Sequence, residues 1–157
     1  NDLQVGPPMK NILIIEDDSF KADSLEQFLI QYNSKADIKI AGSLAEAINS
    51  VNREVFDLIL VDMAIPSHPS VAGGGAPTSL LTGGIDVLLE LNYLNRKDPC
   101  IVVTQYPDID ISGKFYDLKQ AKFEFKDQLG CDVIDCIEYK EGESSWQHSL
   151  KNILDEL

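Results

Sequence analysis

Short apolar runs alternate with amphipathic segments along most of the chain. Residues 11–15 (NILII), 57–61 (DLILV) and 100–104 (CIVVT) are almost continuously apolar, which is typical of strands buried on both faces of a sheet. A weaker strand is expected at residues 37–41, and a fifth strand at 133–139. Between these segments, apolar side chains recur with the spacing of an amphipathic helix, so the pattern predicts strands and helices in alternation.

Signals at the segment ends support the predicted helices. Asp18 is expected to cap the first helix, Ser43 and Glu46 form a capping-box signature, and Gly130 stands where a C-terminal glycine cap would. The helices are expected at residues 20–32, after Ser43, at 85–94, within 113–129, and from 146 to the end. Strand–helix units in series predict a doubly wound α/β domain: a five-stranded parallel sheet with helices on both faces.

Composition narrows the functional classes. The 157 residues include 26 acidic and 13 basic side chains, which gives a net charge of −13. So acidic a chain would be repelled by nucleic acid and by anionic membrane surfaces, and we expect it to bind neither. No apolar run approaches the roughly 18–20 residues that cross a bilayer.

The cysteines and the N-terminal segment bear on compartment and domain limits. Cys100, Cys131 and Cys136 cannot all pair with one another, and we expect reduced, buried thiols in a cytoplasmic protein. We expect Met9 to be the natural initiator and residues 1–8 to be an added or disordered extension. Residues 9–157 are then expected to form one domain.

Polar side chains follow the strands at one edge of the predicted sheet. Glu16 and Asp17 end the first strand, Asp62 the third and Thr104 the fourth, and Lys140 follows the fifth. Clustered carboxylates repel one another unless a cation offsets them, and hard oxygen ligands suit Mg²⁺. A carboxylate beside Mg²⁺ and a lysine is a plausible nucleophile towards phosphorus.

These segments carry a family resemblance. ILIIEDD at 12–18, DLILVDMAIP at 57–66, IVVT at 101–104 and then Lys140 resemble the receiver domain of two-component response regulators, the CheY-like superfamily. The resemblance runs from about Lys10 to the end of the chain. It implies the flavodoxin-like, or receiver, version of the doubly wound fold.

The resemblance also implies a metal site. By it, Asp17 is a direct ligand of Mg²⁺, with Mn²⁺ as an alternative ion, and Glu16 acts through water. Asp62 is the second direct ligand, and the backbone carbonyl of Ala64 is the third.

The remaining roles concern phosphoryl transfer. The resemblance implies that Asp62 is phosphorylated from a phosphohistidine on a histidine kinase or phosphotransfer protein, that Thr104 is the switch hydroxyl, and that Lys140 pairs with the phosphoryl group. The protein is then a signalling component of a two-component or phosphorelay system, not a conventional enzyme. Output is expected through contacts with an effector protein, and a homodimer is a candidate assembly because the family commonly dimerises.

Several positions depart from the family pattern. Residues 67–84 form a Gly/Pro/Ser-rich insertion, residues 107–130 are longer than one helix requires, and Gln105 is bulky where the family favours a small residue. Ile137 and Glu141 replace the usual aromatic residue and proline near the lysine. These departures keep open the alternative of a pseudo-receiver, an interaction module that phosphorylation does not switch.

Other activities fit the residues less well. A phosphohydrolase of the aspartyl-phosphate type resembles its relatives in a second aspartate two residues after the first, but Ala64 stands there. The first strand leads into acidic residues and not into a glycine-rich turn, which argues against a nucleotide site. His68 and His148 are expected on the surface.

Overall fold

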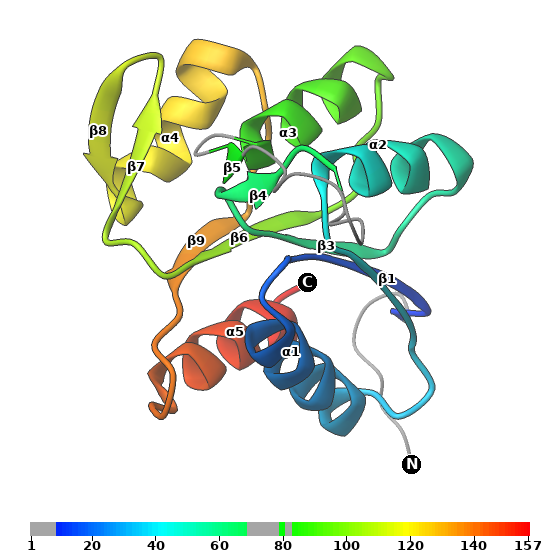
Figure 1. Cartoon of the computed structure of the whole chain (residues 1–157). Helices are drawn as coiled ribbons and strands as arrows, with labels where there is room; N and C mark the ends of the chain where they lie inside the picture. The colour runs from blue at the N-terminus through cyan, green and yellow to red at the C-terminus, as the bar shows by residue number, and fades with distance from the viewer. Residues whose placement is uncertain (1–8, 69–78, 81–82) are drawn as a thin grey trace, which may run out of the picture.

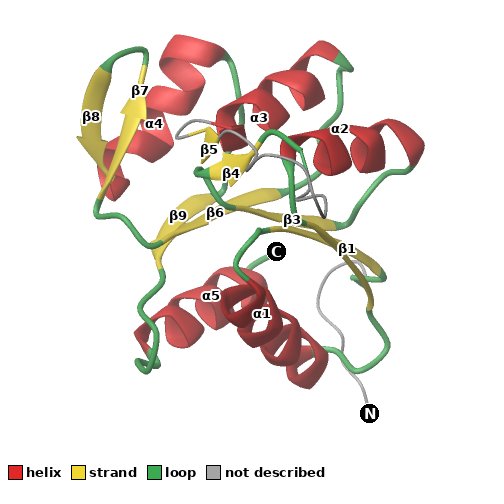
Figure 2. Ribbon diagram, viewed as in Figure 1, coloured by secondary structure: helices red, strands yellow, loops and turns green. Residues whose placement is uncertain are grey.

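The computed structural model describes residues 9–68, 79–80 and 83–157, and within them a five-stranded parallel sheet is the central element (Figures 1 and 2). The strand order is β2-β1-β3-β6-β9, so the predicted doubly wound fold is confirmed. The strands are β1 (Asn11–Ile15), β2 (Asp37–Ala41), β3 (Leu58–Val61), β6 (Cys100–Thr104) and β9 (Asp135–Glu138). Between β1 and β3 the winding changes direction, which is where such sheets place their ligands.

Helices cover both faces of the sheet. In Figure 2, α1 and α5 lie below it and α2, α3 and α4 lie above it. Their bounds are α1 (Ser19–Tyr32), α2 (Leu44–Arg53), α3 (Gly83–Tyr93), α4 (Leu118–Leu129) and α5 (Ser145–Asp155). None of the helices in the described ranges is both long and apolar enough to cross a bilayer.

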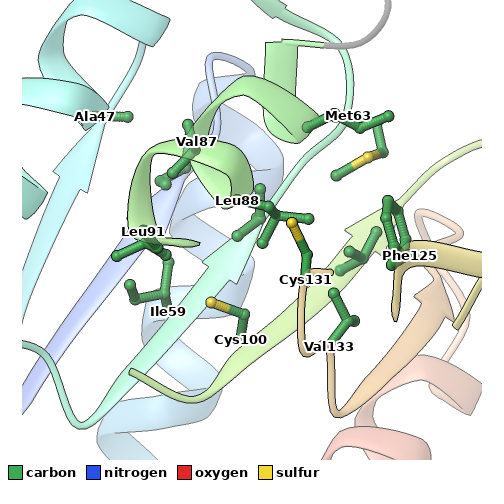
Figure 3. Packing of buried hydrophobic residues seen from close by; sticks show 14 of the residues in the cluster. Ala47, Ile59, Met63, Val87, Leu88, Leu91, Cys100, Phe125, Cys131 and Val133 are labelled. Atoms are coloured by element: carbon green, nitrogen blue, oxygen red, sulfur yellow. The ribbon is translucent and has the colours of Figure 1, made fainter. Parts of the chain in front are cut away.

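The sheet separates two apolar cores, because successive strand side chains point to opposite faces. Ile12 and Ile14 pack with Trp146 on the side of α1 and α5. Leu13 packs on the other side in a larger cluster that includes Phe125 of α4. Figure 3 shows part of this larger cluster, with side chains of α3 and α4 against β3 and β6. Burial on both faces explains why β1, β3 and β6 are apolar throughout.

The predicted helix caps are confirmed. The Asp18 carboxylate accepts hydrogen bonds from the backbone N–H groups of Phe20 and Lys21. Ser43 Oγ accepts one from the backbone N–H of Glu46 at 3.1 Å. Gly130 ends α4 with φ = 68°, a left-handed conformation that favours glycine. These residues fix where α1 and α2 begin and where α4 ends.

A β-hairpin precedes α4. Strands β7 (Asp108–Ile111) and β8 (Lys114–Asp117) pair antiparallel and pack beside α4 (Figure 1). Ser112 and Gly113 both have positive φ, at 56° and 88°, as tight two-residue hairpin turns require. The hairpin accounts for the extra length between 107 and 130 and delays the start of α4 to Leu118.

The segment after β3 begins and ends with short strands. β4 (Ile65–Pro66) pairs antiparallel with β5 (Ser79–Leu80). Gly83 already belongs to α3, so this helix begins two residues before the predicted start at residue 85. Most of the remaining insertion, like the extension at 1–8, lies outside the described residues.

Candidate functional site

Three carboxylates meet at the carboxyl ends of β1 and β3. Glu16 and Asp17 follow β1, and Asp62 follows β3. One carboxylate oxygen from each lies within 4.8 Å of the others. The parallel register explains this meeting, since Ile15 pairs with Val61 and its carbonyl accepts the N–H of Asp62 at 3.0 Å. Glu16 and Asp62 are only 2% and 3% exposed, whereas Asp17 is exposed to solvent.

A buried lysine on α1 lies against these carboxylates. Lys21 is 1% exposed, and its Nζ is 2.6 Å from Glu16 Oε1 and 3.3 Å from Asp62 Oδ1. The same ammonium donates hydrogen bonds to the carbonyl of Val103 at 2.7 Å and to Gln105 Oε1 at 2.8 Å. Four oxygen atoms therefore surround the ammonium, and two of them belong to carboxylates.

Burial makes both inner carboxylates weaker acids than usual. It is the largest effect on Glu16 and raises the pKa of that carboxyl to about 7, although the Lys21 ammonium acts in the opposite direction. Burial also raises the pKa of Asp62, again against the effect of Lys21, and the nearby Asp17 charge adds to the rise. At both carboxyls the effect of burial therefore outweighs the opposing effect of the Lys21 ammonium.

Lys140 lies outside this cluster of charges. It follows β9, as the sequence indicates, but its side chain is exposed, and in the described part of the chain it forms no ion pair with Glu16 or Asp62. The preceding residue explains the difference: the ring of Tyr139 is buried against Trp146, with 5.2 Å between ring centroids, so Lys140 falls on the solvent side. Its predicted contact with a phosphoryl group stays a prediction without a supporting contact.

Thr104 and its neighbours form the other wall of the site. Thr104 is fully buried, and its Oγ1 accepts a hydrogen bond from the N–H of Tyr106 at 3.2 Å. Gln105 uses its side-chain oxygen to hold Lys21. Beyond Thr104, a cavity of about 300 Å³ separates the site from the β7–β8 hairpin. Its lining consists of Met63, Thr104, Tyr106, Pro107, Asp108, Ile109, Asp110 and Phe115.

The sequence interpretation missed Lys21, although its spacing carried a signal. Leu25 and Leu29 mark the buried stripe of α1, and Lys21 precedes Leu25 by one helical turn, so it belongs to the same stripe. A lysine on a buried stripe needs an acidic partner. The acidic residues directly before this helix were the available partners.

The donor set fits a divalent cation. The three carboxylates offer oxygen ligands within 4.8 Å of one another, which is the ligand chemistry that Mg²⁺ and Mn²⁺ prefer. Ala64 lies in the turn directly after Asp62, so its backbone carbonyl belongs to the same strand exit. The exposed Asp17 gives this group a side open to solvent.

Comparisons with known proteins identify the family. A family model described as the response regulator receiver domain matches residues 12–129. The Detocs response regulatory protein DtcB of Vibrio alginolyticus is 32% identical over 146 residues, covering 91% of this chain and 98% of that protein.

Solved structures give the same fold at lower sequence identity. A CheY-like receiver domain from Methanospirillum hungatei JF-1 has a TM-score of 0.61 and 23% identity, and the match covers 95% of this chain and 96% of that one. The receiver domain of sensor histidine kinase PA1611 from Pseudomonas aeruginosa PAO1 has a TM-score of 0.59 and 17% identity, with 95% and 97% covered. That structure holds a magnesium ion coordinated in its active site cleft.

Proposed function

This chain belongs to the response regulator receiver domain family, and from that premise we propose that Asp62 accepts a phosphoryl group from a phosphohistidine on a partner protein. The observation that carries the proposal is the position of Asp62: a buried carboxylate at the end of β3, within 4.8 Å of two further carboxylates. Receiver domains are signalling modules and not conventional enzymes, so we propose that the phosphorylated state of Asp62 is the signal that a partner protein recognises.

The proposed transfer is a substitution at phosphorus. An oxygen of the Asp62 carboxylate forms a bond to phosphorus while the phosphorus–nitrogen bond of the phosphohistidine breaks. The electron pair of that bond stays on the imidazole nitrogen, which then takes up a proton, and Asp62 becomes an acyl phosphate. Thr104, whose hydroxyl lies at the neighbouring strand end, donates a hydrogen bond to a phosphoryl oxygen.

The metal ligands are proposed on the same basis. Asp17, Asp62 and the carbonyl of Ala64 would bind Mg²⁺ directly, with Glu16 acting through water, and Mn²⁺ is the alternative ion. When bound, the ion supplies positive charge that offsets the phosphoryl group. The grouping of three carboxylates with ligand atoms within 4.8 Å of one another supports this assignment.

We also propose partners and a compartment. The phosphoryl donor is a histidine kinase or phosphotransfer protein, and the output passes to an effector through protein contacts in a two-component or phosphorelay system. The described cysteines, Cys100, Cys131 and Cys136, are all free and buried, which supports a reducing cytoplasmic location.

Intact mass measurement tests the central step. The purified chain is incubated with acetyl phosphate and Mg²⁺, and we expect one added phosphoryl group, absent after EDTA treatment and absent in Asp62→Asn. Asp127→Asn is the matched control, because Asp127 is exposed on α4, away from the site, and should leave the adduct unchanged.

A pseudo-receiver is the second candidate function. The observation that favours it is Lys21, which pairs with Glu16 and Asp62 and so neutralises part of the pocket without any metal. If neither acetyl phosphate nor a phosphorylated histidine kinase gives an adduct on the parent protein, the phospho-acceptor proposal is refuted and this second function takes its place.

A further inference from the structure

We propose that Lys21 is the lysine of the phosphorylation site, and that its ammonium, supplied from α1, binds the phosphoryl group on Asp62 in place of Lys140. The inference rests on the proposed function of Asp62 and assigns a role in it that the family resemblance gave to another residue. Lys21 stays protonated throughout and acts by charge and hydrogen bonding.

The position of the ammonium carries the inference. Lys21 Nζ lies 3.3 Å from Asp62 Oδ1, and its remaining contacts are Glu16 Oε1, the Val103 carbonyl and Gln105 Oε1. The contact with Oδ1 leaves the second carboxylate oxygen of Asp62 as the one that forms the bond to phosphorus. A phosphoryl group on that oxygen would add negative charge close to Nζ.

The contacts of Lys21 also let it respond without movement of its helix. An ammonium has three N–H donors, and four different residues offer it oxygen atoms within hydrogen-bonding or ion-pair distance. Two of these, the Val103 carbonyl and the Gln105 amide, are neutral. A phosphoryl oxygen is a stronger acceptor than an amide oxygen, so an N–H can turn from Gln105 to the phosphoryl group while the Val103 contact holds the side chain in place.

Lys140 lacks comparable support. Its side chain is exposed, and the buried ring of Tyr139 takes the inward position after β9. That ring faces Lys21 instead, with Nζ at 5.7 Å from the ring centroid, a distance at which a cation is attracted to the ring. At the end of β9, where the resemblance places the lysine, Tyr139 therefore contributes a buried aromatic ring, while Lys21 of α1 contributes the positive charge.

A consequence for metal binding separates this role from a purely structural one. Lys21 and a divalent cation share the carboxylates of Glu16 and Asp62, so the ammonium opposes entry of the ion. Removing the ammonium should therefore tighten Mg²⁺ binding and, in the same protein, slow phosphorylation of Asp62. A residue needed only for folding would weaken both.

The test compares Lys21→Met with Lys140→Met, which carries the rival assignment, and with the surface control Lys119→Met on α4. Mg²⁺ binding is followed by the fluorescence of Trp146, the single tryptophan, whose ring is 5.2 Å from that of Tyr139. Phosphorylation is followed by intact mass with acetyl phosphate at saturating Mg²⁺. For Lys21→Met we expect ~10-fold tighter Mg²⁺ binding and ~100-fold slower phosphorylation, and for Lys119→Met the parental values.

The outcomes separate the two proposals. If the parent is phosphorylated and Lys21→Met matches its rate, or if Lys140→Met alone loses the adduct, the Lys21 assignment is overturned while the function of Asp62 stands. If the parent is never phosphorylated, both proposals fall.

A measurement on the parent protein covers the case in which Lys21→Met does not fold. The ¹⁵N resonances of the lysine ammonium groups are recorded before and after phosphorylation, and Lys140→Met, a surface variant, identifies the Lys140 signal. We expect the buried Lys21 signal to shift and the Lys140 signal to stay in place. The reverse pattern would return the role to Lys140.

Discussion

Gly84, in the first turn of α3, lies directly against the backbone that carries the phospho-acceptor. Its N–H donates a hydrogen bond to the carbonyl of Met63 at 2.9 Å. A Cβ atom at this position would lie 2.4 Å from the carbonyl oxygen of Asp62, 2.5 Å from Met63 Cε and 3.0 Å from Met63 Cα. The methionine terminus can turn away, but the Asp62 carbonyl belongs to the backbone and can move only with the strand end. Gly84→Ala should therefore displace the site.

The size of the effect follows from two opposing terms. Carbon–oxygen contacts normally lie near ~3.4 Å, so about 1 Å of displacement is needed, and overpacking of this kind costs ~1–3 kcal/mol. The alanine recovers at most ~1 kcal/mol through its greater helix propensity. We expect a net loss of up to ~3 kcal/mol in the free energy of unfolding, with Tm falling by ~2–4 °C for each kcal/mol.

Urea and thermal unfolding followed by circular dichroism measure this loss, and intact mass measures Asp62 phosphorylation in the folded variant. Gly42→Ala is the matched control. A Cβ there would meet only ordinary contacts, at 3.5 Å from Glu46 Oε1 and 3.8 Å from the Glu16 carbonyl, so its stability should stay close to the parent's. If Gly84→Ala unfolds at the parental urea concentration and is phosphorylated at the parental rate, the proposed steric coupling between α3 and Asp62 is refuted.

Three further predictions concern stability and reactivity. Burial raises the pKa of Asp98, but hydrogen bonds from Arg96 and from the Phe56 N–H lower it more, to a net value below the usual one. The ionised Asp98 carboxylate therefore stabilises the folded protein fully above its unfolded pKa of ~4, and this stabilisation is lost as pH falls through the lower folded pKa. Asp98→Asn should lower the free energy of unfolding in urea by ~2–4 kcal/mol at pH 7 and by less at pH 3. Gly130→Ala places a side chain at φ = 68° and should cost ~1–2 kcal/mol in the same assay, whereas a variant as stable as the parent would contradict the left-handed cap. Burial raises the pKa of the Cys100 thiol to about 12, so we expect no reaction with Ellman's reagent at pH 8 until urea unfolds the chain.

The sequence predicted the central sheet well because burial on both faces leaves a local signal. β1, β2 and β6 begin and end at the residues expected from their composition. The hairpin of β7 and β8 escaped prediction because half of the residues in each short strand are charged, and because its turn places Ser112, a residue that seldom adopts positive φ, at φ = 56°. The Ser-Gly dipeptide at residues 112–113 was the available turn signal.

The sequence predicted that the carboxylates of the site would meet, but it did not reveal the buried lysine beside them, and the difference has a physical reason. Glu16, Asp17 and Asp62 follow strands whose register is fixed by burial, so the sequence determines that they meet. The direction in which the Lys140 side chain points depends on which of its neighbours is buried. Tyr139 is buried against Trp146, a contact between residues that only the folded structure reveals. The signal for Lys21 was its place on the buried stripe of α1, where a charged side chain requires a partner of opposite charge.

The charges at the site favour binding of a divalent cation in addition to the Lys21 ammonium. Lys21 is 1% exposed and reaches Glu16 and Asp62 from the interior, whereas Asp17 completes the carboxylate group on the solvent side. One ammonium faces three nearby carboxylates, and repulsion between carboxylates adds to the effect of burial in raising the pKa values of Glu16 and Asp62. A pseudo-receiver that relied on Lys21 alone would be more stable with Asp17 replaced by a neutral residue, because that carboxylate raises the pKa of Asp62 and has no share in the lysine's ion pairs. An exposed carboxylate at this position is accessible to a cation that arrives from solvent, and Asp17→Asn should accordingly weaken Mg²⁺ binding while leaving the unfolding free energy unchanged or slightly raised.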